Sequence, residues 1–185
     1  MSVPTVAVVG FPNVGKSTLV NRLAGGREAV THAQPGVTRD RKRVACEWNG
    51  VAFELLDTGG IDAADESEMA EDVQRQARLG IEEASVVLLV GDARAGVRAG
   101  DADLARTLRG GGVPVLVAVN KIDRPGDEHL AAEFHKLGLG EPLAVSATHG
   151  IGSGDLLDQI VESLGDLPSS DPAEEATRLP LGRPA

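Results

Sequence analysis

The sequence is poor in aromatic residues and in cysteine. Its 185 residues include no tyrosine, one tryptophan and three phenylalanines, and aromatics make up 2% of the chain. A core must therefore be built from Val, Leu, Ile and Ala, which favours buried strands flanked by helices over an aromatic-rich β-sandwich. The single cysteine, Cys46, cannot form an intramolecular disulfide, so nothing in the sequence points to an oxidising compartment.

Positive charge and long apolar runs are scarce as well. Lysine and arginine number 18 against 28 aspartate and glutamate residues, which gives a net charge of −10. Tight nucleic-acid binding requires neutralisation of phosphates, so we expect none by this domain alone. No apolar run reaches the roughly 20 residues that span a bilayer, and the N-terminus lacks the pattern of a signal peptide. We expect a cytoplasmic monomer with no membrane partner.

Apolar residues nonetheless make up 42% of the chain, enough for one domain with its own core. Short β-branched runs alternate with segments whose apolar residues recur at helical spacing. The expected strands are 5–9, 44–48, 51–56, 86–90, 113–119 and 142–145. The expected helices are 16–23, one with an apolar stripe between 69 and 84, 102–108, 128–137 and one ending near 165. This alternation predicts an α/β fold: a mostly parallel six-stranded sheet with one antiparallel edge strand and helices on both faces.

The segment from Gly10 to Ser17 reads G-F-P-N-V-G-K-S and matches the phosphate-binding pattern G-x-x-x-x-G-K-[ST]. It lies between an expected strand and an expected helix, where backbone N–H groups can point at phosphates. Lys16 would place its charge against the β- and γ-phosphates, and the Ser17 hydroxyl is a hard oxygen ligand for Mg²⁺. The alternative is a glycine-rich turn that binds nothing. The residues expected to contact nucleotide here are Gly10, Phe11, Pro12, Asn13, Val14, Gly15, Lys16, Ser17 and Thr18.

Two further motifs predict which base is bound. Asn120-Lys121-Ile122-Asp123 follows an expected strand, and Asp123 can accept hydrogen bonds from the N1–H and 2-amino groups of guanine. Adenine lacks this pair of donors, so the carboxylate selects against it and against an ATP-using enzyme such as a small kinase. Ser146-Ala147-Thr148 follows the last expected strand, and its backbone N–H groups could reach the guanine O6. Either segment alone is also compatible with a simple turn.

Two segments are expected to respond to the γ-phosphate. In Asp57-Thr58-Gly59-Gly60, the Asp57 carboxylate would hold Mg²⁺ through water, and the Gly60 N–H would meet the γ-phosphate. The polar segment 26–43 is long for a structureless connection, which is typical of functional loops. Within it, the Thr38 hydroxyl could close onto Mg²⁺ and the γ-phosphate when GTP is bound.

These motifs, G-F-P-N-V-G-K-S, P-G-V-T-R-D, D-T-G-G, N-K-I-D and S-A-T, together resemble the TrmE–Era–EngA–Septin-like P-loop GTPases. The resemblance is greatest to the first G domain of the EngA/Der-type GTPases, and it covers about residues 4–165. It implies the P-loop GTPase fold, hydrolysis of GTP to GDP and phosphate, and a switch role in assembly of the large ribosomal subunit. The implied metal ligands are Ser17, Thr38 and Asp57. The implied catalytic residues are Lys16, Thr38, Asn13 and Gly60.

One departure from better-known GTPases bears on the rate. Ile61 stands where a water-orienting glutamine would follow the D-x-x-G motif, so hydrolysis must rely on positioning and electrostatics and should be slow. In similar GTPases a P-loop asparagine holds K⁺ near the transferring phosphate, and the match of Asn13 to that position implies K⁺ stimulation. A module that binds guanine nucleotide with negligible hydrolysis remains the alternative function. We expect a G domain over 1–165 and a Pro-rich linker over 166–185. Gly182-Arg183-Pro184 either begins a second G domain or is part of an ordinary Pro-rich tail.

Overall fold

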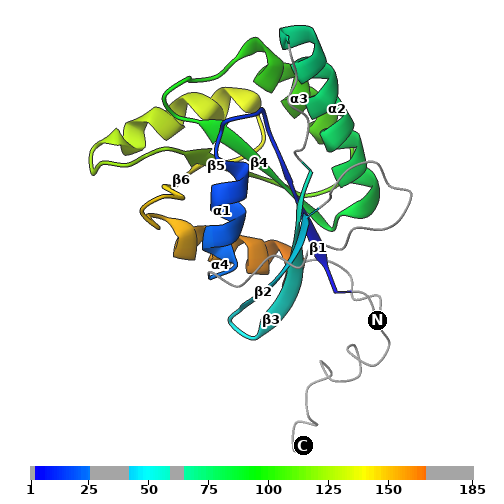
Figure 1. The fold of residues 1–185 in the computed structure, drawn as a ribbon, viewed down its shortest axis with the longest axis vertical. Coiled ribbons are helices and arrows are strands. Elements are labelled where there is room, and N and C mark those ends of the chain that lie inside the picture. Colours follow the sequence, from blue (N-terminus) through cyan, green and yellow to red (C-terminus); the bar gives the residue numbers. More distant parts are fainter. Residues whose placement is uncertain (1–2, 26–41, 59–64, 166–185) are drawn as a thin grey trace, which may run out of the picture.

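The computed structural model describes residues 3–25, 42–58 and 65–165. Strands and helices alternate along them almost without interruption (Figure 1). The strands are β1 (Thr5–Val9), β2 (Lys42–Trp48), β3 (Val51–Asp57), β4 (Val86–Asp92), β5 (Val115–Asn120) and β6 (Leu143–Ala144). The helices are α1 (Lys16–Leu23), α2 (Glu66–Glu83), α3 (Ala99–Arg109), the 3₁₀ helix η1 (Asp127–Leu137) and α4 (Ser153–Gly165).

All six strands form one sheet in the order β2-β3-β1-β4-β5-β6. β2 pairs antiparallel with β3 across the turn at Asn49-Gly50, and every other pair in the sheet is parallel. β2 therefore lies at one edge as the single antiparallel strand of this sheet. The predicted architecture, an α/β fold with a mostly parallel six-stranded sheet and one antiparallel edge strand, is confirmed.

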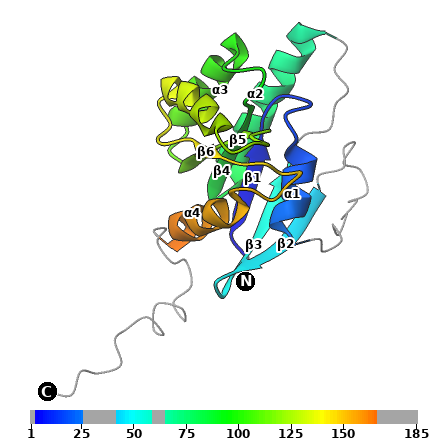
Figure 2. The ribbon, with the colours of Figure 1, turned by 90° about the vertical axis from the view of Figure 1, so that its left-hand side faces the viewer.

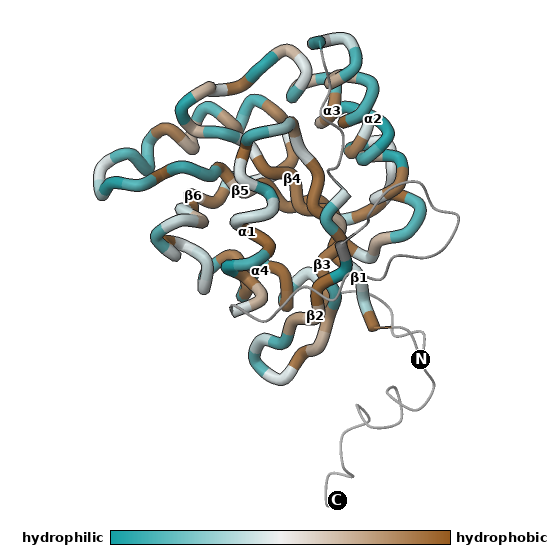
Figure 3. Tube along the Cα trace, viewed as in Figure 1, coloured by the Kyte–Doolittle hydropathy of each residue, from teal (hydrophilic) through white to brown (hydrophobic). Residues whose placement is uncertain are grey.

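Helices cover both faces of the sheet, which explains why the central strands are continuously apolar. Val6 to Val9 in β1 have no exposed surface. Ala7 faces α2 at Gly80, where an added Cβ would lie 3.2 Å from the Ala7 Cβ, so the glycine allows close packing. Val6 and Val8 point the other way, where α1 lies against β1 and β3 and packs on α4 (Figure 2). The most hydrophobic parts of the trace run along these inner strands (Figure 3).

Several element boundaries differ from the predicted ones. β6 is limited to two residues, and Pro142, which lacks an N–H to pair with β5, precedes it. β5 begins at Val115, after Pro114, rather than at 113. The predicted helix at 128–137 is a 3₁₀ helix between Gly126 and Gly138, both with left-handed φ angles. Within the described ranges, no helix is both long and apolar enough to cross a membrane.

Candidate nucleotide-binding site

The predicted motifs meet at the carboxyl edge of the parallel strands. The phosphate loop connects the end of β1 to α1, Asp57 ends β3 and Asn120 ends β5. Ser146 follows β6 on the same side of the sheet. This edge is where ligands bind in open α/β sheets, because the loops leaving neighbouring strands converge there. Thr38, Gly59, Gly60 and Ile61 lie outside the described residues, so their expected roles remain predictions.

The phosphate loop needs backbone conformations that its sequence supplies. Gly15 has a φ of +94°, and a Cβ there would lie 2.2 Å from the Asn120 side-chain nitrogen. Asn13 has a φ of 67°, a left-handed conformation that asparagine tolerates better than most residues. Phe11 and Val14 are buried in the core, so they can offer only their backbone to a ligand. Thr18 is exposed on the first turn of α1.

Lys16 is the buried cation of the site, with 8% of its surface exposed. Its ammonium donates to the carbonyl oxygen of Gly10 and, at 3.2 Å, to the side-chain oxygen of Gln76. Burial lowers the pKa of Lys16, while the charges of Asp57 and Asp72 act to raise it. The ammonium is therefore poorly solvated in the protein, and phosphate oxygens would compensate for that loss.

Ser17 and Asp57 form a pair of oxygen groups that fits Mg²⁺. The Ser17 hydroxyl donates to the Asp57 carboxylate at 3.0 Å, and Asp57 is 4% exposed. In the described part of the chain, no group of three or more His, Cys, Asp or Glu could hold a metal ion. Mg²⁺ at nucleotide sites typically uses one or two protein oxygens together with phosphates and water, so this pair is sufficient.

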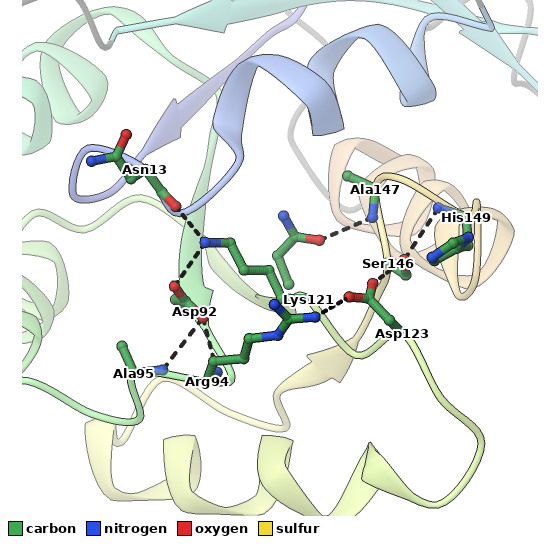
Figure 4. Close-up of polar contacts among 10 residues, drawn as sticks. Asn13, Asp92, Arg94, Ala95, Lys121, Asp123, Ser146, Ala147 and His149 are labelled. Carbon is green, nitrogen blue, oxygen red and sulfur yellow. Dashed lines mark hydrogen bonds and ion pairs between the residues drawn. The ribbon is translucent and has the colours of Figure 1, made fainter.

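At the base end of the site, the Asp123 carboxylate is held from two sides (Figure 4). One oxygen accepts from the Ser146 hydroxyl at 2.7 Å and the other from the Arg94 guanidinium at 2.8 Å. The Arg94 side chain is 70% exposed, so a guanine edge can replace it at the carboxylate at little cost. Ile122 is buried in the core at 1% exposure, which fixes the loop that presents Asp123.

Lys121 connects the base end to the phosphate loop (Figure 4). Its ammonium donates to the backbone oxygen of Asn13 at 2.7 Å and to the Asp92 carboxylate at 2.9 Å. Burial acts to raise the pKa of Asp92, but hydrogen bonds from Lys121 and from the Arg94 backbone bring that pKa below its usual value. Sequence reasoning overlooked Asp92 and Arg94. Asp92 ends β4 as Asn120 ends β5, and this position at the end of an apolar strand would have pointed to it and to the loop that carries Arg94.

Asn120 joins two loops of the site. It is 4% exposed, its amide nitrogen donates to the Val14 oxygen at 2.9 Å, and its amide oxygen accepts from the Ala147 N–H at 2.9 Å. The Ser146 N–H donates to the Ile151 oxygen at 2.8 Å. The backbone donors expected to meet guanine O6 thus have partners within the protein at Ser146 and Ala147. Recognition of O6 by this segment, Thr148 included, remains a prediction.

We expect the substitution Asn120→Ala to lower the free energy of unfolding by roughly 2–4 kcal/mol, because it leaves a buried carbonyl and a buried N–H unsatisfied. Denaturant unfolding without nucleotide measures this. Asn21→Ala, on the exposed surface of α1, is the matched control and should change stability by less than about 0.5 kcal/mol. Equal stabilities of the two variants would show that Asn120 does not join these loops.

Gln76, on α2, is the other residue that sequence reasoning overlooked. Its side-chain oxygen accepts from the Gly10 N–H at 3.2 Å and from the Lys16 ammonium at 3.2 Å, and it lies 3.1 Å from the Thr58 hydroxyl oxygen. Its amide nitrogen donates to the Asp72 carboxylate at 2.9 Å. Thr58 has a single hydroxyl proton, and its shorter contact, 2.7 Å to the Val8 oxygen, takes that proton.

Comparison with known proteins gives a consistent family. Residues 5–121 match the family model described as "50S ribosome-binding GTPase". Along its whole length the chain is 48% identical to GTPase Der from Gloeobacter violaceus, of which it covers 41%. It is 45% identical to GTPase Der from Pelotomaculum thermopropionicum, of which it covers 42%. The chain thus spans about two fifths of the length of these curated relatives.

Solved structures of Era proteins share the fold. One is a variant of Aquifex aeolicus Era bound to GDP·AlF₄⁻, with a TM-score of 0.69, 34% identity and coverage of 92% of this chain and 59% of that one. Another is Era in complex with MgGDPNP and nucleotides 1506–1542 of 16S ribosomal RNA, with a TM-score of 0.68, 34% identity and coverage of 93% and 59%. The predicted resemblance to EngA/Der-type GTPases is confirmed by the curated relatives.

Proposed function

The chain belongs to the family of 50S ribosome-binding GTPases, and we propose that it is a Mg²⁺-dependent switch that binds guanine nucleotide and hydrolyses GTP to GDP and phosphate. One observation supports this most directly. Two side chains, Lys16 and Asp123, lie at the same edge of one mostly parallel sheet, Lys16 at the start of α1 and Asp123 just after β5. The buried lysine would thus meet the phosphates of a guanine nucleotide, and the carboxylate would meet its base.

The residues divide the chemistry between them. Lys16 and the phosphate-loop amides would hold the β- and γ-phosphates in place and stabilise the charge that develops as the γ-phosphoryl group leaves. Ser17 and Asp57 would hold Mg²⁺, which when bound neutralises phosphate charge. Thr38 and Gly60 would complete the γ-phosphate contacts. Since Ile61 cannot orient water, we propose that hydrolysis is slow and depends on this positioning.

We also propose that K⁺ stimulates hydrolysis through Asn13, whose side chain is exposed at the phosphate loop. Single-turnover phosphate release is expected to be roughly tenfold faster in K⁺ than in Na⁺, a difference in barrier of about 1.4 kcal/mol. The substitution Asn13→Gly removes the side chain, and glycine tolerates the φ of 67° at this position. This variant should release phosphate equally slowly in both salts.

The same assay separates hydrolysis from binding alone. Equal native rates in K⁺ and Na⁺ would remove the role of K⁺ while leaving the GTPase proposal intact. Tight binding of GDP with no phosphate release in either salt would instead favour a nucleotide-dependent interaction module. Competition of GDP against ADP tests the choice of base in the same preparation.

The biological setting is a further proposal. The curated relatives are named GTPase Der, and the matching family is described as ribosome-binding. We propose that a protein containing this G domain acts on the large ribosomal subunit or its precursor. We place that domain at 1–165, with 166–185 as a linker. Co-sedimentation of the full-length protein with large subunits, in GTP analogue against GDP, tests this.

A further inference from the structure

Gln76 offers one oxygen to two donors of the phosphate loop. The oxygen of Gln76 accepts from the Gly10 N–H and from the Lys16 ammonium, both at 3.2 Å. Both distances exceed the usual 2.9–3.0 Å of such bonds. Gln76 can therefore release Lys16 and keep the Gly10 N–H as a partner.

The orientation of Gln76 is fixed by its surroundings. Gln76 is 2% exposed, and its amide nitrogen donates to Asp72, itself 5% exposed. Because a carboxylate faces one end of the amide and the Gly10 N–H and the Lys16 ammonium face the other, only one orientation satisfies both ends. Asp72 thereby holds the oxygen of Gln76 toward Lys16.

Lys16 has three N–H donors, and two of them are directed at protein oxygens, one on Gly10 and one on Gln76. One donor is left for a β-phosphate, which GDP provides. GTP offers the γ-phosphate as well, so a second donor must leave a protein partner. The oxygen of Gly10 belongs to the backbone, whereas the Gln76 oxygen keeps the Gly10 N–H as a donor, so Gln76 is the partner that Lys16 leaves.

We propose that Gln76 sets the preference of the site between GDP and GTP, because its side-chain oxygen competes with the γ-phosphate for the Lys16 ammonium. This inference rests on the proposed function. GDP binding retains the link between Gln76 and Lys16, and GTP binding breaks it. Since Gln76 lies on α2, the break also changes how that helix is held to the phosphate loop.

Two variants test this in opposite directions. In Gln76→Met the competing oxygen is removed, so the affinity for a non-hydrolysable GTP analogue relative to GDP should rise about tenfold. The double variant Asp72→Asn/Gln76→Glu keeps the net charge. It also keeps a hydrogen bond between the two side chains, but the amide at position 72 now donates to the carboxylate at position 76. The carboxylate now contacts Lys16 directly, so relative affinity for the analogue should fall by about tenfold.

The matched control is Gln74→Met, on the same helix. The side-chain oxygen of Gln74 accepts from the Thr107 hydroxyl at 2.6 Å, which joins α2 to α3 and involves no residue of the phosphate loop. Calorimetry gives the dissociation constants of GDP and of the analogue for each protein, and circular dichroism confirms folding. The control should leave the ratio of the two constants unchanged.

The outcomes separate the inference from the proposed function. Native protein that binds neither nucleotide would overturn both. A second outcome is that the native protein binds both nucleotides, but the double variant leaves the affinity for the analogue relative to GDP unchanged or raises it. This outcome would overturn the role of Gln76 and leave the proposed function intact. If Gln76→Met does not fold, the double variant decides. Equal weakening of GDP and analogue in every variant would assign Gln76 to structure and overturn the inference.

Discussion

Asparagine at position 123 is expected to abolish the preference for guanine and to create one for xanthine. The Asp123 carboxylate can accept from both N1–H and the 2-amino group of guanine, whereas an asparagine amide places a donor opposite that amino group. Because two hydrogen-bond donors would then face each other without an acceptor, we expect the affinity for GDP to fall at least about a hundredfold in Asp123→Asn. Xanthine carries a carbonyl in place of the amino group, so XDP should bind tightly. Calorimetry with GDP and XDP measures both changes.

The structure shows why this substitution should be tolerated by the fold. Asp123 is bonded to the Ser146 hydroxyl, which can donate equally to an amide oxygen. Its other partner, Arg94, is largely exposed and can turn to water. Asp103→Asn, at an exposed ion pair with Arg106 on α3, is a control of equal charge change and should alter neither affinity. Unchanged GDP binding by Asp123→Asn, with no gain for XDP, would exclude Asp123 as the group that selects the base.

The sequence predicts most of this site because its parts are local. In the phosphate loop and in Asn120 to Asp123, the required residue types lie at fixed offsets after an apolar strand, so periodicity and spacing identify them together. The alternation of strands and helices then predicts the α/β fold class, whereas the order of the strands comes from the structure. The structure confirms the fold, and it places Lys16 and Ser17, at the start of α1, at the same sheet edge as Asp123.

Contacts between distant segments could not be predicted in this way. Gln76 meets Lys16 and Gly10 across 60 and 66 residues of sequence, and that contact depends on how α2 lies across the sheet. In the sequence it is only a glutamine beside the apolar stripe of an amphipathic helix. Asn120 is similar: its motif predicts base recognition, but its bonds to Val14 and Ala147 follow from how two loops are placed. The spacing of apolar residues likewise does not distinguish a 3₁₀ helix such as η1 from an α-helix.

Lys16→Met is expected to remove nucleotide binding without unfolding the protein. The side chains are similar in length, so methionine can fill the same buried volume. Truncating one partner of a buried, hydrogen-bonded charge pair costs about 2–5 kcal/mol of binding free energy, so affinity for GDP and GTP should fall at least about thirtyfold. Calorimetry measures this loss, and phosphate release should become undetectable.

The substitution Lys16→Met should weaken nucleotide binding but should not lower the free energy of unfolding. Burial lowers the pKa of Lys16, and this is the largest influence on it, exceeding the attraction of Asp57 and Asp72. A base whose pKa is lowered on folding binds its proton less well in the folded state, so the charged ammonium opposes folding at neutral pH. Without nucleotide, Lys16→Met should therefore be at least as stable as the native protein in denaturant. Lys136→Met, on the exposed side of η1, should change neither property. The substitution Lys16→Met removes only the ammonium from the phosphate loop. Strong GDP binding by this variant would therefore show that groups other than Lys16 hold the phosphates.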